Sequence, residues 1–300
     1  MGFEVRALGM LPSLFLSFDR KGKGDEKEES DGGDRIEIAF PKIIHHDEDN
    51  HILQLEDVGS RTLHESYTDP TLDISSIGKS IGRWLAILHQ STTSDLIKDQ
   101  FNHVVAKRMY RWNYNGLADV LERYGFDPEL GRRINERFGA LIESDDICVC
   151  HTDLWPGNIL ISHQQQHGSQ DDLSKLGVVE WPSRNSKVQL AVIDWEVTRN
   201  GDGMTDVGHF AGEAFFLDRL RGGRGLLNSF LKGYLKQKGK LSERERGRVA
   251  AEFGTRITFW PSIYVSFMFG MVTKISMNEC ANLKCGDCRN GLVRMRKQTS

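Results

Sequence analysis

The sequence lacks the features expected of a disulfide-rich or strongly basic protein. Its 300 residues include only five cysteines and seven prolines, and its net charge is −3. Five cysteines are too few for a disulfide framework in a chain of this length, which favours buried thiols in a reducing compartment. Without an excess of basic residues, recognition of nucleic acid through a broadly positive surface is disfavoured. With 39% hydrophobic and 27% charged residues, the composition is that of an ordinary globular protein.

A long apolar run is also missing. The 17 residues from Ile257 to Thr273 carry no charge, but they include a proline and a glycine. That length is at the short end of the roughly 17–25 residues that a membrane-spanning helix needs. The apolar patch from Leu8 to Phe18 follows Glu4 and has no clear small-residue cleavage site of the kind that ends a signal peptide. We therefore expect a cytoplasmic protein without a membrane partner.

Two polar segments interrupt the globular pattern. Residues 19–35 consist almost wholly of charged residues, glycine and serine, and they predict a charged linker. Residues 162–189 form a second polar stretch that is rich in glutamine and serine at its start. Both are expected to be surface excursions from a compact fold.

The apolar spacing elsewhere predicts an α+β chain, with a small β-containing part before a larger, mainly helical one. Strands are expected at 36–44 and 51–55, paired as a hairpin, and at 147–150, 159–161 and 190–193. Apolar residues spaced by three and four predict a helix over 74–88, capped by Asp73 or Ser75, and mainly helical structure from Asp206 to about residue 274. Asp127-Pro128 is typical of a further helix start.

The strongest motif is His151-Thr152-Asp153-Leu154-Trp155-Pro156-Gly157-Asn158, which lies between two expected strands. It has the H-x-D-L-x-x-x-N spacing of the catalytic loop of phosphoryl-transfer enzymes. In such a loop the carboxylate accepts the proton of a hydroxyl group, and the amide oxygen binds Mg²⁺ without adding a negative charge beside the phosphates. We therefore expect Asp153 to be the catalytic base and Asn158 to be a metal ligand.

A second acidic residue follows a later apolar strand. In Ala191-Val192-Ile193-Asp194-Trp195-Glu196, the carboxylate of Asp194 comes where a kinase places its second metal ligand. Asp194 and Asn158 together would hold Mg²⁺ on the β- and γ-phosphates of ATP. Each of these residues alone could be an ordinary turn or capping residue, but both motifs in this order favour a shared site.

Taken together, these motifs resemble the aminoglycoside phosphotransferase/choline kinase superfamily of small-molecule kinases. The resemblance rests on 151–158, on Ile193 to Glu196, and on the Asp202 and Asp206 that follow. It implies a protein-kinase-like bilobal fold, with residues 1–58 as the N-lobe and 59–300 as the C-lobe. It also implies that His151 braces the catalytic loop. Asp206 is expected either to anchor that loop or to cap the helix that follows it.

The resemblance extends to the N-terminal part. Residues 41–59 resemble the last N-lobe strands and the hinge, which implies that the backbone of Leu55, Glu56 and Asp57 bonds the adenine of ATP. The stretch from Phe3 to Leu8 resembles the helix whose glutamate pairs with the phosphate-binding lysine, here Glu4. No credible counterpart of that lysine or of the glycine-rich strands is found, so we expect a truncated N-lobe.

Two functions remain open on these grounds. The first is an ATP- and Mg²⁺-dependent phosphotransferase acting on a hydroxyl group of a small molecule. The second is a catalytically impaired kinase-like protein, or a fragment from an incomplete gene model, that acts as a binding module. The acceptor and the oligomeric state are not specified by any pattern. Glu196, Asp202 and Glu213 either favour an aminated acceptor or belong to a solvated acidic surface. Cys280, Cys285 and Cys288 have no clear fourth ligand for a zinc site.

Overall fold

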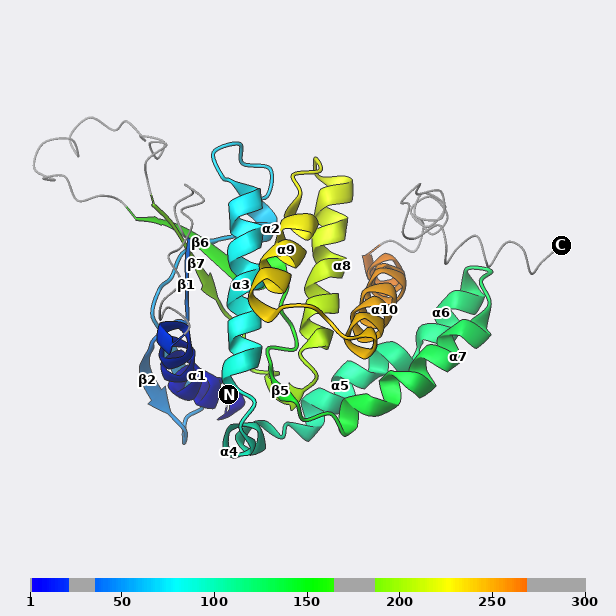
Figure 1. Cartoon of the computed structure of the whole chain (residues 1–300), viewed down its shortest axis with the longest axis horizontal. Helices are drawn as coiled ribbons and strands as arrows, with labels where there is room; N and C mark the ends of the chain where they lie inside the picture. Colours follow the sequence, from blue (N-terminus) through cyan, green and yellow to red (C-terminus); the bar gives the residue numbers. More distant parts are fainter. Residues whose placement is uncertain (1, 22–35, 165–186, 269–300) are drawn as a thin grey trace, which may run out of the picture.

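The computed structural model describes residues 2–21, 36–164 and 187–268, and it confirms the α+β class (Figure 1). The helices are α1 (Gly2–Lys21), α2 (Leu63–Ser66), α3 (Ile74–Ser91), α4 (Asp95–Lys98), α5 (Val104–Asn115), α6 (Leu117–Arg123), α7 (Pro128–Arg137), α8 (Met204–Leu220), α9 (Leu226–Lys238) and α10 (Glu243–Met268), with 3₁₀ turns η1 (Asp99–Phe101), η2 (Gly139–Glu143) and η3 (Pro156–Asn158). The strands are β1 (Glu37–Ala39), β2 (Ile43–Asp47), β3 (Ile52–Leu55), β4 (Arg61–Thr62), β5 (Cys148–Cys150), β6 (Ile159–Gln164), β7 (Lys187–Val192) and β8 (Arg199–Gly201).

The described strands form three small sheets; the main sheet and the β2–β3 pair lie at one side of the molecule, and the short β5–β8 pair lies nearer the middle, beside α5 (Figure 1). The main sheet has the order β1-β7-β6-β4, in which β6 and β7 are antiparallel neighbours and β1 runs parallel to β7. The predicted hairpin is confirmed as the antiparallel pair of β2 and β3. The first part of the expected strand 36–44 is the separate β1, which joins β7 instead.

Both predicted polar segments are shorter than expected. Strand β6 continues to Gln164 and β7 begins at Lys187, because main-chain pairing between them extends past the last apolar residues. Helix α1 continues to Lys21, and Asp19 there forms an ion pair of 2.7 Å with Arg83 on α3. The start of the linker at residue 19 and the bounds of the insert at 162 and 189 were therefore wrong. The rest of both segments lies outside the described residues.

Helix α3 occupies the centre of the molecule, with α9 packed along it (Figure 1). It begins as predicted, because the side chain of Asp73 accepts a hydrogen bond from the amide of Ser76. Its apolar face is buried, as the three-and-four spacing requires. Helix α1 packs against α3 through Ala7 and Leu11, which are fully buried. The N-terminal helix is therefore part of the main core.

The expected division into two lobes at residue 58 stays a prediction. Strand β1 comes from the expected N-lobe, but it is hydrogen-bonded to β7 of the expected C-lobe. Cys148 and Cys150 are buried free thiols, as predicted. The cysteines at 280, 285 and 288 lie outside the described residues. Within the described part of the chain, no helix has the length and hydrophobicity needed to cross a membrane.

Candidate active site

The two predicted motifs meet at the end of the β6–β7 pair. Asn158 immediately precedes β6, and Asp194 follows β7 by two residues. Since the strands are antiparallel and pair Ile159 with Val192, these residues come to the same end of the sheet. The amide of Ile193 donates a hydrogen bond of 3.0 Å to the Asn158 carbonyl, which fixes the two segments side by side. Residues 36 positions apart in sequence therefore share one site.

The three predicted chemical groups contact one another through the Asn158 side chain. Its Nδ2 donates to the backbone carbonyl of Asp153 at 2.9 Å and to Asp153 Oδ2 at 3.2 Å. The same nitrogen lies 3.4 Å from Asp194 Oδ2. Asn158 is buried, whereas the Asp153 side chain keeps 40% of its surface exposed. The arrangement therefore places two carboxylates and one amide around a point that solvent can reach.

Backbone strain accompanies this geometry. Thr152 has φ of 79° and Asp194 has φ of 66°, in the left-handed region that residues with a side chain seldom adopt. Such conformations cost on the order of 1–3 kcal/mol and persist where the surrounding structure enforces them. Here they turn the chain sharply just before Asp153 and at Asp194 itself.

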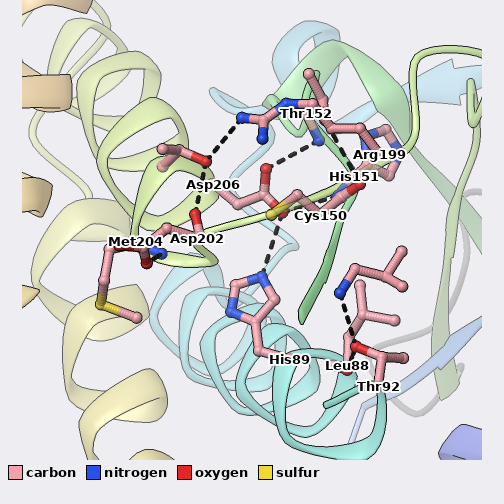
Figure 2. Close-up of polar contacts among 12 residues, drawn as sticks. Leu88, His89, Thr92, Cys150, His151, Thr152, Arg199, Asp202, Met204 and Asp206 are labelled. Carbon is pink, nitrogen blue, oxygen red and sulfur yellow. Dashed lines mark hydrogen bonds and ion pairs between the residues drawn. The ribbon is translucent and has the colours of Figure 1, made fainter. Parts of the chain in front are cut away.

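Asp206 provides much of that enforcement. This buried residue in the first turn of α8 accepts hydrogen bonds from the amides of His151 at 2.8 Å and Thr152 at 2.9 Å. From the opposite side, His89 Nε2 on α3 lies 3.2 Å from its carboxylate (Figure 2). Of the two roles left open for Asp206, the geometry favours loop anchoring over capping. The amide of Met204, at the start of α8, is instead bonded by Asp202.

His151 joins the loop to the segment that carries Asp194. Its ring is fully buried, packs against Trp195 at a centroid distance of 4.5 Å, and has Nε2 3.0 Å from the carbonyl of Ile193. Burial lowers the pKa of His151, so its ring is neutral and its Nε2–H donates to that carbonyl. This position suits the bracing role expected of His151.

The site has an excess of carboxylates. Burial raises the pKa of Asp194, and the charges of Asp153 and Glu196 raise it further. Burial also raises the pKa of Asp153, an effect that the guanidinium of Arg256 opposes. Like charges held this close disfavour their own ionisation, and a bound cation relieves that repulsion.

The donor set fits Mg²⁺. Carboxylate and amide oxygens are the ligands that this hard cation prefers. Asn158 uses its nitrogen on Asp153, and no described residue donates a hydrogen bond to its Oδ1. Asn158 Oδ1 and Asp194 can therefore both face a cation while Asn158 still holds Asp153. Among the described residues there is no group of three or more His, Cys, Asp or Glu suited to a metal.

Glu4 reaches the same site from α1. It is half-buried, and burial, followed by the charge of Asp194, raises the pKa of its carboxyl group, while a hydrogen bond from the backbone of Trp195 opposes that rise. Glu4 thus lies beside the residue that follows Asp194. Among the described residues, no lysine forms an ion pair with Glu4, although the resemblance implies one.

The expected hinge residues follow β3. Leu55 ends the strand and pairs with Ile43, and the amide of Glu56 donates to the carbonyl of Lys42 at 2.8 Å. That amide is therefore already engaged. Asp57 is exposed and accepts a hydrogen bond from the amide of Gly59, where an added Cβ would meet the backbone carbonyl of Ile161 on β6 at 3.0 Å. The hinge segment thus leads onto the strand that follows Asn158.

Two side chains near Asp153, those of His209 and Arg256, were not predicted as site residues, whereas Glu213 was considered for the acceptor side. His209 on α8 has Nε2 3.7 Å from Asp153 Oδ1. Arg256 on α10 forms an ion pair of 2.6 Å with Glu213 on α8. His209 lies three residues after Asp206, so the helical period places both on one face, a signal that the sequence does contain. Arg256 lies about a hundred residues from the catalytic loop, and no local pattern marks it.

Asp202 does not join the catalytic cluster. It lines two cavities of about 470 and 260 Å³ together with Arg244. Neither cavity is lined by Asp153, Asn158 or Asp194. The suggestion that Asp202 provides negative charge for the acceptor therefore has no geometric support.

Comparison with known proteins agrees with the motifs. The model of the phosphotransferase enzyme family matches residues 33–169, which include the catalytic loop but end before Asp194. The 4-hydroxytryptamine kinase of Psilocybe cyanescens is 25% identical over 216 residues, which are 68% of this chain and 55% of that protein. The enzyme of the same name from Psilocybe cubensis is 25% identical over 235 residues, which are 74% of this chain and 60% of that protein.

A solved ethanolamine kinase of Plasmodium vivax aligns with 74% of this chain and 58% of its own, at 16% identity and a TM-score of 0.40. The chain thus spans somewhat more than half the length of the curated relatives that it matches.

Proposed function

We propose that this chain, which is similar to the phosphotransferase enzyme family over residues 33–169, transfers the γ-phosphoryl group of ATP to a hydroxyl group of a small molecule, in a reaction that requires Mg²⁺. The observation that carries the proposal is the contact of Asn158 with both Asp153 and Asp194. Ordinary turn residues would not be expected to lie around one partially exposed point. A catalytic base and two oxygen ligands of a cation must lie together for phosphoryl transfer.

Asp153 is the proposed catalytic base. Its carboxylate is open to solvent on one side and held by Asn158 on the other, so it can accept the proton of an acceptor hydroxyl. As that proton leaves, the acceptor oxygen forms a bond to the γ-phosphorus, and the bond from this phosphorus to the leaving oxygen of ADP breaks. General base catalysis by a positioned carboxylate contributes about 10²–10⁴-fold to such a rate.

Asn158 and Asp194 are the proposed ligands of Mg²⁺. The cation, when bound, neutralises the charge of the β- and γ-phosphate oxygens. Asn158 Oδ1 and the Asp194 carboxylate would face it, while Asn158 Nδ2 keeps Asp153 oriented. The left-handed backbone at Asp194 aims its carboxylate back toward the loop. Asp206, His151 and Glu4 are proposed to support this arrangement.

Leu55, Glu56 and Asp57 are proposed to bind adenine through their backbone. Since the Glu56 amide is engaged by Lys42, the groups left for adenine are the backbone groups of Leu55 and Asp57 and the Glu56 carbonyl. A reaction that consumes ATP and the two buried free thiols both favour the cytoplasm.

An aromatic or aliphatic amine that carries a hydroxyl group is the first class of acceptor to test. The curated relatives are named for 4-hydroxytryptamine, and Glu213 lies on the α8 face near Asp153. Glu213 is paired with Arg256, so its charge is already balanced. For this reason the panel also includes choline-like alcohols, sugars and aminoglycosides.

The experiment is a phosphoryl-transfer assay with labelled ATP and Mg²⁺ against this panel. We expect transfer to at least one hydroxyl acceptor by the wild-type chain, and a loss of about 10²–10⁴-fold in Asp153→Asn. Asp119→Asn, an exposed carboxylate on α6, is the matched control and should keep the wild-type rate. Wild-type turnover that survives Asp153→Asn would refute the assignment.

The binding-module alternative makes the opposite prediction. A kinase-like protein without catalysis would bind nucleotide or acceptor but transfer no phosphate to any member of the panel. That result, with ligand binding confirmed by a shift in Tm, would replace the proposed function.

A further inference from the structure

His209 is a buried histidine that the proposed reaction does not yet use. It lies in the second turn of α8, three residues beyond Asp206, and its side chain is only 3% exposed. Among the described residues, neither ring nitrogen has a partner at ordinary hydrogen-bond geometry, and only the backbone of Thr152 interacts weakly with the ring. Burying such a polar group without a partner costs about 1–3 kcal/mol, so an apolar residue would be more stable here unless the ring has another task.

The surroundings of His209 point to that task. Its Nε2 faces Asp153 Oδ1 at 3.7 Å, just beyond hydrogen-bond length. The ring of Tyr110 on α5 lies at a centroid distance of 6.3 Å, the backbone of Thr152 interacts with the ring as a weak hydrogen-bond acceptor, and Arg256 and His151 are the cationic or titratable side chains around it. Of these groups, the carboxylate is the strongest acceptor for a ring N–H.

His209 can act as a hydrogen-bond donor whose charge does not change near neutral pH. Burial holds the pKa of His209 well below its ordinary value, and the charges of Arg256 and His151 lower it further. The ring is therefore neutral and carries one N–H group. With the proton on Nε2, that group is directed at the open oxygen of the base.

We propose that His209 is a positioning residue for Asp153, whose Oδ1 it holds through Nε2–H while Asn158 holds Oδ2. This inference rests on the proposed role of Asp153. With both oxygens restrained, the carboxylate keeps one orientation toward the acceptor hydroxyl. The role requires that this contact, 3.7 Å here, shorten to a hydrogen bond when the site is occupied. Misplacement of a catalytic group by about 1 Å can cost about 10²-fold in rate, which is the scale of the benefit.

The first test reads the ring directly and needs no turnover. Long-range proton–nitrogen NMR spectra of the full chain with labelled histidine distinguish protonated from unprotonated ring nitrogens, and His209→Gln assigns the signals. We expect a neutral ring protonated on Nε2, and a shift of that nitrogen in Asp153→Asn. A ring protonated on Nδ1, or a signal that Asp153→Asn leaves unchanged, overturns the proposal. Absence of phosphoryl transfer would instead count against the proposed function.

The second test separates positioning from packing. His209→Leu keeps the volume but removes the donor, and we expect kcat to fall about 10- to 100-fold with KM for ATP within about twofold of wild type. His209→Gln restores an N–H donor and should recover most of that loss. His209→Leu should unfold at a Tm no lower than that of His209→Gln, because leucine buries no unpaired polar group. Equal losses in the two variants, or a His209→Leu rate equal to wild type, overturn the proposal.

Discussion

Among single residues, Asp206 has the most connected position in the site. Its carboxylate accepts hydrogen bonds from two backbone amides of the predicted catalytic loop and faces His89 on α3 (Figure 2). The amide of Thr152, one of these two donors, belongs to a residue with strained backbone. Asp206 therefore supplies binding energy that keeps a strained loop in place.

Removal of the Asp206 charge should destabilise the protein in a pH-dependent way. Burial alone would raise the pKa of Asp206, but the hydrogen bond and charge of His89 lower it below its ordinary 3.8. Burial lowers the pKa of His89, but Cys148 and Asp206 raise it above its ordinary 6.5. The Asp206 contribution is thus present above pH 3.8 and lost as the pH falls through its lower folded pKa. The His89 contribution is complete below pH 6.5 and lost as the pH rises through its folded pKa.

For Asp206→Asn we expect a loss of about 3–5 kcal/mol in the free energy of unfolding between those two pH values. The difference from wild type should shrink on the alkaline side as His89 loses its proton. Urea unfolding across the pH range measures it, with Asp119→Asn as the control. A difference that is small, or that is constant from acid to alkaline pH, would contradict this account of the pair.

Residue identity in the site could be predicted where the motif is local. Motif spacing predicts Asp153, Asn158 and Asp194, and the structure brings them together. The motifs do not predict that His209, Arg256 and Glu213 lie near Asp153, because their approach depends on how α8 and α10 cross. Helix crossing depends on side-chain packing over long sequence separations, which spacing along one segment does not contain.

At the level of elements, the close contact of α3 with α9 depends on glycine. A side chain at Gly82 would meet the backbone carbonyl of Phe230 and the amide of Tyr234, the latter at 2.6 Å. Gly233 on α9 meets the backbone of Lys79 on α3 in the same way. Because α3 also carries His89, the contact between α3 and α9 fixes the position of the histidine that binds Asp206.

Gly82→Ala should therefore destabilise the protein by about 1–3 kcal/mol or more, since the backbone of α9 cannot move away without opening the core. Gly254 on α10 is the matched control, because a side chain added there meets nothing within 4 Å. Gly254→Ala should gain up to about 1 kcal/mol, as expected for glycine replaced inside a helix. Urea unfolding of the two variants measures both changes in the free energy of unfolding. No loss of stability in Gly82→Ala would show that the helices are not in fixed contact.

Element type was predictable where periodicity is strong, and element ends were not. The apolar stripe and Asp73 cap of α3 were predicted and are confirmed. The ends of β6 and β7 were missed, because polar residues there continue the strand through main-chain hydrogen bonds. The parallel pairing of β1 with β7 was also missed, since no local feature of residues 37–39 specifies a partner 152 residues away.

At the level of the whole molecule, the site draws on distant parts of one packed core. The loop and the Asp194 segment meet through the β6–β7 pair, α8 supplies Asp206 and His209, and α1 brings Glu4 beside Trp195. The order of the two motifs along the chain predicted that the catalytic loop and the Asp194 segment would meet. The position of α1 followed only from the resemblance, because its burial against α3 depends on the tertiary fold.

The most direct measurement of the central claim is divalent cation binding in the presence of ATP. Mn²⁺ can stand in for Mg²⁺, and electron paramagnetic resonance reports how much of it remains free. The wild-type chain and Asp119→Asn should bind Mn²⁺ with equal affinity, and Asp194→Asn should bind it at least about tenfold more weakly at unchanged Tm. Equal Mn²⁺ affinity in the wild-type chain and Asp194→Asn would contradict the claim that the two motifs form one cation site.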